Sequence, residues 1–144
     1  NYDKNNNGEY TSTGIRIGIW KASISVWESS PVFGIGVGDG KTELVKEYDK
    51  RKMTNCFTAK FNSHNQYLDT SLAIGAFGVF ILVIIILFSF INYGKLTTLT
   101  LAIMGVIGGS LLVESMLEKQ AGAVFISWII ALIVSIRPVL RSLK

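Results

Sequence analysis

The stretch FNSHNQYLD, residues 61–69, brings together the side chains of this chain that are best suited to chemistry. It holds the only histidine, His64, and the amide and carboxylate side chains around it are Asn62, Asn65, Gln66 and Asp69. A neutral imidazole can take a proton from a substrate hydroxyl when a neighbour fixes its tautomer. The residues leave two roles open: a hydrogen-bonded structural histidine at a membrane boundary, which is the more frequent case for such a position, and a general base.

Basic side chains that could accompany His64 lie in the segment GIRIGIWK, residues 14–21. Arg16 lies beside an apolar stripe, and an arginine can hold a phosphate through two parallel hydrogen bonds. Lys21 follows it on the same segment. We predict His64 as the catalytic residue and Arg16, Asn65 and Lys21 as substrate-binding residues.

Several other chemistries are excluded by what the sequence lacks. Cys56 is the only cysteine, so no structural zinc site and no internal disulfide can form, and we expect no metal and no cofactor. The segment FGIGVGDGKT, residues 33–42, misses both the dinucleotide fingerprint and the P-loop register, so its glycines indicate a tight loop in which backbone approaches backbone or a ligand. The basic residues form no stripe with stacking aromatics, so we expect no nucleic-acid partner.

The apolar residues are concentrated in the second half of the chain. Residues 1–70 carry 9 Lys or Arg and 8 Asp or Glu, whereas residues 71–144 carry 5 and 2. Charge-free runs cover residues 70–94, 96–113 and 120–136, and a membrane-spanning helix needs about 17–25 apolar residues. We predict an all-α integral membrane protein with three transmembrane helices at about 70–93, 96–114 and 120–137. Three buried helices of a soluble bundle are the alternative.

The loops between these runs predict the orientation. Alternation places Lys95 and the C-terminal Arg137, Arg141 and Lys144 on one side, and excess positive charge marks the cytoplasmic side. Residues 1–67 then form part of an extracytoplasmic loop domain, on the same side as the loop from Glu114 to Lys119. Residues 68–144 form the membrane domain.

Two helices are expected before the first span. Residues 14–29 carry two apolar stripes at helical spacing, Ile17, Trp20, Ile24 and Trp27 on one and Ile15, Ile19, Ala22 and Val26 on the other. Two tryptophans suit a helix at the membrane interface, and an ordinary helix packed on two sides is the alternative. Residues 41–52 predict a short solvated helix.

The order of these motifs resembles the O-antigen ligase and polymerase-like family of bacterial membrane proteins. The matching residues are Arg16 and Trp20, then Pro31 before Gly34, Gly36 and Gly38, then His64, Asn65, Tyr67 and Leu68, and lastly Gly75 and Gly78. The segment ESMLEKQAGAVF, with Glu114, resembles a later loop of the family. Family members are much longer, so the chain resembles their C-terminal third.

The resemblance implies a multi-pass protein of the bacterial inner membrane that transfers a glycan without a metal. The donor would be a glycan on undecaprenyl pyrophosphate, and the acceptor a hydroxyl of lipid A-core or of another glycan. His64 matches the functional histidine of the family and Arg16 one of its functional arginines. A repeat-unit polymerase, a ligase for other polymers or for protein, and a non-catalytic truncated remnant stay open. A transporter is disfavoured, because the three expected spans contain no ionisable group.

Overall fold

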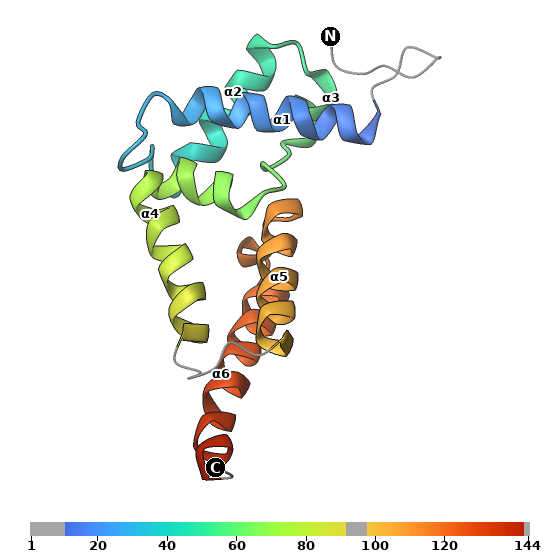
Figure 1. Cartoon of the computed structure of the whole chain (residues 1–144). Coiled ribbons are helices and arrows are strands. Elements are labelled where there is room, and N and C mark those ends of the chain that lie inside the picture. The colour runs from blue at the N-terminus through green and yellow to red at the C-terminus, as the bar shows by residue number, and fades with distance from the viewer. Residues whose placement is uncertain (1–10, 92–97, 143–144) are drawn as a thin grey trace.

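The computed structural model describes residues 11–91 and 98–142, and these residues contain helices and no strand. The helices, in chain order, are α1 (Ser12–Trp27), α2 (Asp39–Lys50), α3 (Thr54–Ala59), α4 (Gln66–Ile91), α5 (Thr98–Val113), the 3₁₀ helix η1 (Met116–Glu118) and α6 (Gln120–Ser142). Figure 1 shows α1, α2 and α3 gathered at one end of the molecule, with α5 and α6 side by side beneath them. The prediction of an all-α chain is confirmed.

α1 starts and ends where local chemistry dictates. The Thr11 hydroxyl accepts a hydrogen bond from the Gly14 amide at 3.0 Å, which caps the first turn. The helix ends at Trp27, four residues before Pro31, which cannot donate a backbone hydrogen bond. The expected helix at residues 14–29 therefore exists, displaced by two residues, and the expected helix at residues 41–52 is α2.

The two apolar stripes of α1 have different surroundings. Ile19, Ala22 and Val26 are buried against Leu44 and Tyr48 of α2, Cys56 of α3 and Leu72 of α4. On the other stripe, Ile17 and Ile24 are 41% and 43% exposed. One stripe therefore builds the core of this end of the molecule, and the other leaves apolar surface uncovered.

α4 is sharply kinked at Gly75, whose φ of 73° and ψ of −166° are not helical. Figure 1 shows the part of α4 before the kink running beneath α1, and the part after the kink pointing away from α1. A second core cluster, made by Ile107, Leu111 and Ile126, holds α5 against α6. The first predicted span, residues 70–93, overlaps α4 but contains this kink, which the sequence analysis did not predict.

The loop between α1 and α2 stabilises the kink. At a kink, backbone amides and carbonyls of the helix lose their helical partners, and here the loop supplies new ones. The amides of Ala76 and Phe77 donate to the carbonyls of Pro31 and Val32 at 2.8 and 3.3 Å. In the other direction, the amides of Ile35 and Gly36 donate to the carbonyls of Leu72 and Ala73 at 2.8 and 3.1 Å. The glycine-rich loop is thus a backbone-to-backbone contact, one of the two roles predicted for it.

Gly34 and Gly75 meet at the centre of this contact. A side-chain carbon added to Gly34 would lie 2.5 Å from the Gly75 nitrogen, and one added to Gly75 would lie 2.5 Å from the Gly34 nitrogen and overlap the Val32 carbonyl. Both residues have positive φ, 71° and 73°, a conformation that glycine adopts without penalty. Only glycine fits both positions.

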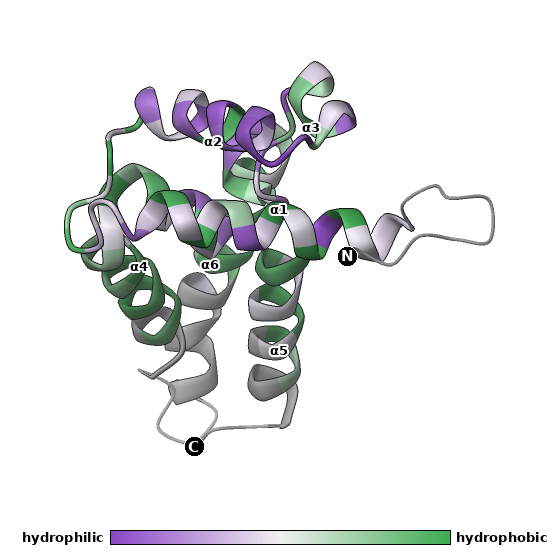
Figure 2. Ribbon diagram, turned by 90° about the horizontal axis from the view of Figure 1, so that it is seen from above, coloured by the Kyte–Doolittle hydropathy of each residue, from purple (hydrophilic) through white to green (hydrophobic). Residues whose placement is uncertain are grey.

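One helix in the described part of the chain is long and apolar enough to cross a membrane, Gln66–Leu87 of α4, and Gln120–Leu132 of α6 is a shorter apolar helix. Figure 2 shows α4 largely hydrophobic and α2 largely hydrophilic. The number of spans and their orientation stay predictions. Lys95 and Lys144 lie outside the described residues, as do the side chains of Arg137 and Arg141.

Candidate active site

The loop between α3 and α4 holds His64 in a constrained backbone conformation. Its φ of 48° is left-handed, which is uncommon for a residue other than glycine. The His64 amide donates to the Asn62 side-chain oxygen at 3.3 Å, and the Ser63 hydroxyl donates to the Asn65 carbonyl at 2.7 Å. The short polar side chains on either side of His64 therefore set its backbone conformation.

Asn65 caps α4. Its side-chain oxygen accepts hydrogen bonds from the amides of Tyr67 and Leu68 at 3.0 and 3.2 Å, as an N-cap residue does. The residue is 6% exposed. Because Asn65 caps the helix, His64 is the residue immediately before the cap. The proposed contact of Asn65 with substrate stays a prediction.

The imidazole of His64 faces Glu114, which follows α5. The distance from Nδ1 of His64 to Oε1 of Glu114 is 3.7 Å, within ion-pair range but too long for a hydrogen bond. Nδ1 is buried and has no hydrogen-bond partner among the described residues, whereas the side chain as a whole is 28% exposed. The ring edge also meets Phe61, with the ring centres 5.6 Å apart and the planes at 63°. Nδ1 is therefore directed inward, and the exposed part of the side chain lies elsewhere on the ring.

The carboxylate of Glu114 is held ionised by its neighbours. Lys119 donates a hydrogen bond to Oε1 of Glu114 at 3.0 Å. This hydrogen bond is the main reason why the pKa of Glu114 lies below its ordinary value, and the charges of Lys119 and His64 act in the same direction. The Glu114 carboxylate is therefore placed where it can attract the positive charge that an imidazole acquires when it takes a proton from a substrate.

The whole segment after α5 packs on the His64 loop. Three hydrogen bonds join them: the Ser115 hydroxyl donates to Asp69, the Leu117 amide donates to the Gln66 side chain at 2.7 Å, and the Asn62 side chain donates to Glu118 at 2.6 Å. Asp69 also accepts from the Ser63 amide at 3.1 Å. The segment after α5 therefore fixes the His64 loop and the start of α4.

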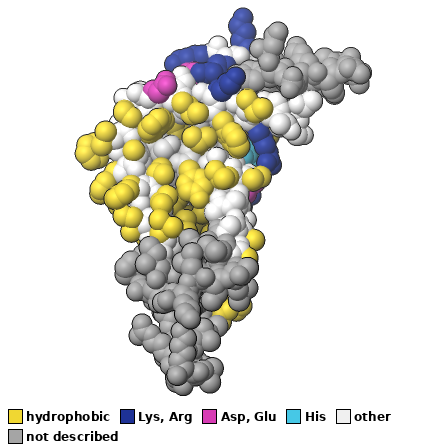
Figure 3. Space-filling model, viewed as in Figure 1, with side chains coloured by type: hydrophobic (Ala, Val, Ile, Leu, Met, Phe, Trp, Pro, Cys, Tyr) yellow, Lys and Arg dark blue, Asp and Glu magenta, His cyan; other side chains and the backbone are white. Residues whose placement is uncertain are grey.

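Arg16 is linked to the His64 loop through Trp20. The Trp20 indole donates to the Ser63 carbonyl at 3.1 Å, and Arg16 lies one helical turn before Trp20 on the same face of α1. Arg16 is half-buried and forms no ion pair with the residues that the structure describes. Figure 3 shows the single histidine of the chain next to a group of Lys or Arg side chains on the molecular surface.

Lys21 is exposed and, within the described residues, has no hydrogen bond to the His64 loop. The structure thus joins the His64 loop, Asn65 and, through Trp20, the Arg16 face of α1, and no hydrogen bond of the described residues joins Lys21 to them. The binding roles of Arg16 and Lys21 stay predictions.

The sequence analysis did not single out Glu114 and Lys119 as site residues. The available signal was topological, because alternating spans place the Glu114–Lys119 loop on the same side as His64. The contact of Glu114 with His64 joins residues 50 positions apart, and no local sequence pattern predicts such a contact. In the described ranges no three His, Cys, Asp or Glu side chains are grouped as metal ligands.

Comparisons with known proteins identify the family of the chain. The family model described as O-antigen ligase matches residues 2–83, which include Arg16, the kink contact and the His64 loop. An uncharacterized protein of Haemophilus influenzae (strain ATCC 51907 / DSM 11121 / KW20 / Rd) is 36% identical over 112 residues, which cover 73% of this chain and 27% of that protein. The chain thus spans about a quarter of the length of this relative. No solved structure matches the chain.

Proposed function

Since the chain belongs to the O-antigen ligase family, we propose that it is part of a membrane glycosyltransferase that moves a glycan from undecaprenyl pyrophosphate to a hydroxyl of lipid A-core or of another glycan. Family membership together with the apolar helix α4 indicates a membrane protein. The transfer takes place at the extracytoplasmic face of the inner membrane and needs no metal.

The pairing of His64 with Glu114 carries this proposal. In the proposed step, His64 takes the proton of the acceptor hydroxyl, and the oxygen attacks the anomeric carbon of the donor on the face opposite the phosphate. The bond from that carbon to the phosphate oxygen breaks, and undecaprenyl pyrophosphate leaves with the electron pair. Glu114 acts through His64, as a positioning residue whose charge lies 3.7 Å from Nδ1 and attracts the proton-bearing imidazole as the proton is transferred.

Arg16 supplies the charge that the leaving group needs. Negative charge on the pyrophosphate grows as the bond breaks, and a preorganised cation stabilises it. Arg16 is suited to this, because α1 presents it on the face bonded to the His64 loop through Trp20. A contact of His64 with the phosphates is the alternative role for the imidazole.

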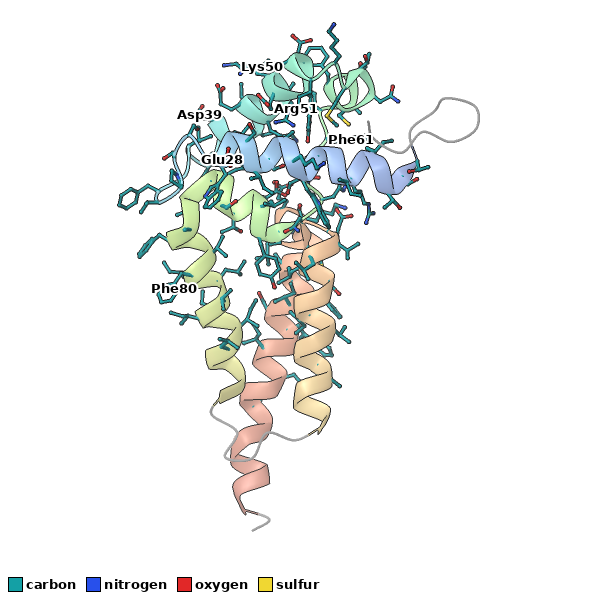
Figure 4. The ribbon with its side chains drawn as sticks, turned by 45° about the horizontal axis from the view of Figure 1, so that its top comes forward. Glu28, Asp39, Lys50, Arg51, Phe61 and Phe80 are labelled. Atoms are coloured by element: carbon teal, nitrogen blue, oxygen red, sulfur yellow. The ribbon has the colours of Figure 1, made fainter. Side chains whose placement is uncertain are left out.

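The apolar surface fits this membrane placement. Ile17 and Ile24 on α1 are about half-exposed, and Phe77 and Phe80 on α4 are 53% and 62% exposed. Figure 4 shows Phe80 on the outer side of α4. We propose that α1 lies at the membrane interface, that residues 1–67 are extracytoplasmic, and that α4, α5 and α6 provide three spans.

The experiment measures glycan transfer in membranes that contain the full-length protein, with undecaprenyl pyrophosphate-linked donor and either lipid A-core or free glycan as acceptor. His64→Ala should abolish transfer, and Arg16→Ala should reduce it at least 100-fold, while each variant inserts normally. Lys46→Ala is the control, since Lys46 pairs with Glu43 on the exposed face of α2. Full transfer by His64→Ala would refute the proposal.

The acceptor arms of the same assay separate a ligase from a polymerase. Transfer to lipid A-core alone indicates a ligase, and elongation of the free glycan indicates a repeat-unit polymerase. Glu114→Gln should lower kcat with little change in KM, because the variant still fills the space but no longer carries the charge that attracts the proton-bearing imidazole of the transition state.

A further inference from the structure

A separate cavity of about 240 Å³ lies between the start of α2, the part of α4 before the kink and the loop after α5. Its lining residues are Gly36 and Val37 of the loop before α2, Gly40, Lys41 and Leu44 of α2, Asn62 of the loop before α4, Gln66, Asp69, Thr70, Leu72, Ala73 and Ile74 of α4, and Glu118 of η1. Neither the expected chemistry of His64 nor the phosphate role of Arg16 uses this cavity.

The lining is suited to a neutral ligand with many hydroxyls. Lys41 and the amides of Asn62 and Gln66 donate hydrogen bonds, Asp69 and Glu118 accept them, and Leu44, Leu72 and Ala73 provide apolar wall. Two carboxylates against a single lysine disfavour a phosphate. Some of these groups already pair within the protein, as Asn62 does with Glu118 and Gln66 with Thr70. A purely apolar ligand would still leave their second amide hydrogens and remaining carboxylate lone pairs without partners. A sugar ring, with an apolar face and hydroxyls that both donate and accept, meets both requirements.

The cavity adjoins the candidate active site through Asn62. The Asn62 amide nitrogen donates to Glu118 at 2.6 Å in the cavity wall, while its oxygen accepts from the His64 amide at 3.3 Å. A ring bound in the cavity would therefore lie next to the ring that reacts at His64. The volume is below the roughly 300–1,000 Å³ of sites for drug-sized ligands, so it fits one ring and not an oligosaccharide.

We propose that this cavity is a glycan subsite that holds one neutral sugar ring, adjacent to the reacting one, of the donor or the acceptor. The inference rests on the proposed glycan transfer and adds to it a place for substrate recognition. Lys41 and Thr70 are the side chains to test. Lys41 is exposed and has no ion pair among the described residues, and the Thr70 hydroxyl accepts from Gln66 at 3.3 Å.

The test compares Lys41→Ala and the isosteric Thr70→Val with Lys46→Ala, which alters the same helix outside the cavity. Steady-state transfer by the full-length protein is measured with the donor varied and then with the acceptor varied. Each cavity variant should raise KM for one of the two substrates about 10-fold, with kcat changed less than twofold. The substrate whose KM rises is the one that occupies the cavity.

A second measurement keeps the two proposals distinguishable. Binding of the free glycan to the purified protein is titrated calorimetrically without any transfer, and it should weaken about 10-fold in Lys41→Ala and be unchanged in Lys46→Ala. Unaltered KM values and unaltered binding would overturn the subsite while the transfer function, tested by His64→Ala, stands. Weakened binding together with full transfer by His64→Ala would support the subsite and refute the transfer mechanism.

Discussion

The contact of Gly34 with Gly75 predicts that Gly34→Ala will strongly destabilise the protein. The added carbon would lie 2.5 to 2.7 Å from backbone atoms of Gly75, Ile74 and Ala73, and backbone cannot move aside as a flexible side chain can. The loop must therefore withdraw from α4. Withdrawal breaks the four hydrogen bonds that replace the helical ones at the kink.

The magnitude follows from these losses. A residue other than glycine in the left-handed conformation costs about 1–2 kcal/mol, and each backbone hydrogen bond contributes about 0.5–1.5 kcal/mol net. With four bonds at stake, the free energy of unfolding should fall by about 3–8 kcal/mol. At roughly 3 °C per kcal/mol for a chain of this length, Tm should fall by about 10 °C or more.

Thermal unfolding of the purified protein in detergent measures this directly, and Gly38→Ala is the matched control. Gly38 belongs to the same loop, but its φ is −91° and a carbon added there meets no atom within 4 Å. The Tm of the Gly38→Ala variant should differ from that of the unaltered protein by less than about 3 °C. If Gly34→Ala unfolded within 3 °C of the unaltered protein, the contact would not support the kink as described.

Two further predictions concern the site. Trp20→Phe removes the hydrogen bond to the Ser63 carbonyl and should lower transfer about 10- to 100-fold, since small displacements of reacting groups have effects of this size. Trp27→Phe loses a comparable bond to a loop carbonyl and should leave transfer within twofold. Equal losses in the two variants would contradict the role of Trp20 in joining α1 to the His64 loop. The lowered pKa of Glu114 implies stability that is present at neutral pH and lost as the pH falls through that pKa. Lys119→Gln should therefore have a lower Tm than the unaltered protein at pH 7, and this difference in Tm should fade as the pH falls below the ordinary pKa of 4.5. A difference in Tm that does not depend on pH would refute this.

Features set by local pattern were predictable from the sequence. The buried stripe of α1, Ile19, Ala22 and Val26, follows from helical spacing, and α2 follows from its polar, charge-alternating residues. The glycine-rich loop after Pro31 was expected to be a tight loop that approaches either backbone or a ligand, and the sequence did not say which. For the two helices the physical cause lies within a few residues of the feature.

Features set by contacts distant in sequence were not predictable. The kink at Gly75 interrupts a uniformly apolar run, and its stabilising partner is a loop about 40 residues earlier. The pairing of Glu114 with His64 depends on how the chain returns after α5. The short α3 and η1 carry too few residues for a periodic signal.

The proposed chemistry requires the His64 loop to lie outside the cytoplasm, because the lipid-linked donor is used there. The direct measurement is labelling of intact cells with a membrane-impermeant maleimide, using Thr58→Cys on the exposed face of α3 and Lys95→Cys in the predicted cytoplasmic loop, with Cys56, 3% exposed, as the internal blank. We expect position 58 to be labelled in intact cells and position 95 only after lysis. Labelling of position 95 alone in intact cells would place His64 on the cytoplasmic side and contradict the proposed function.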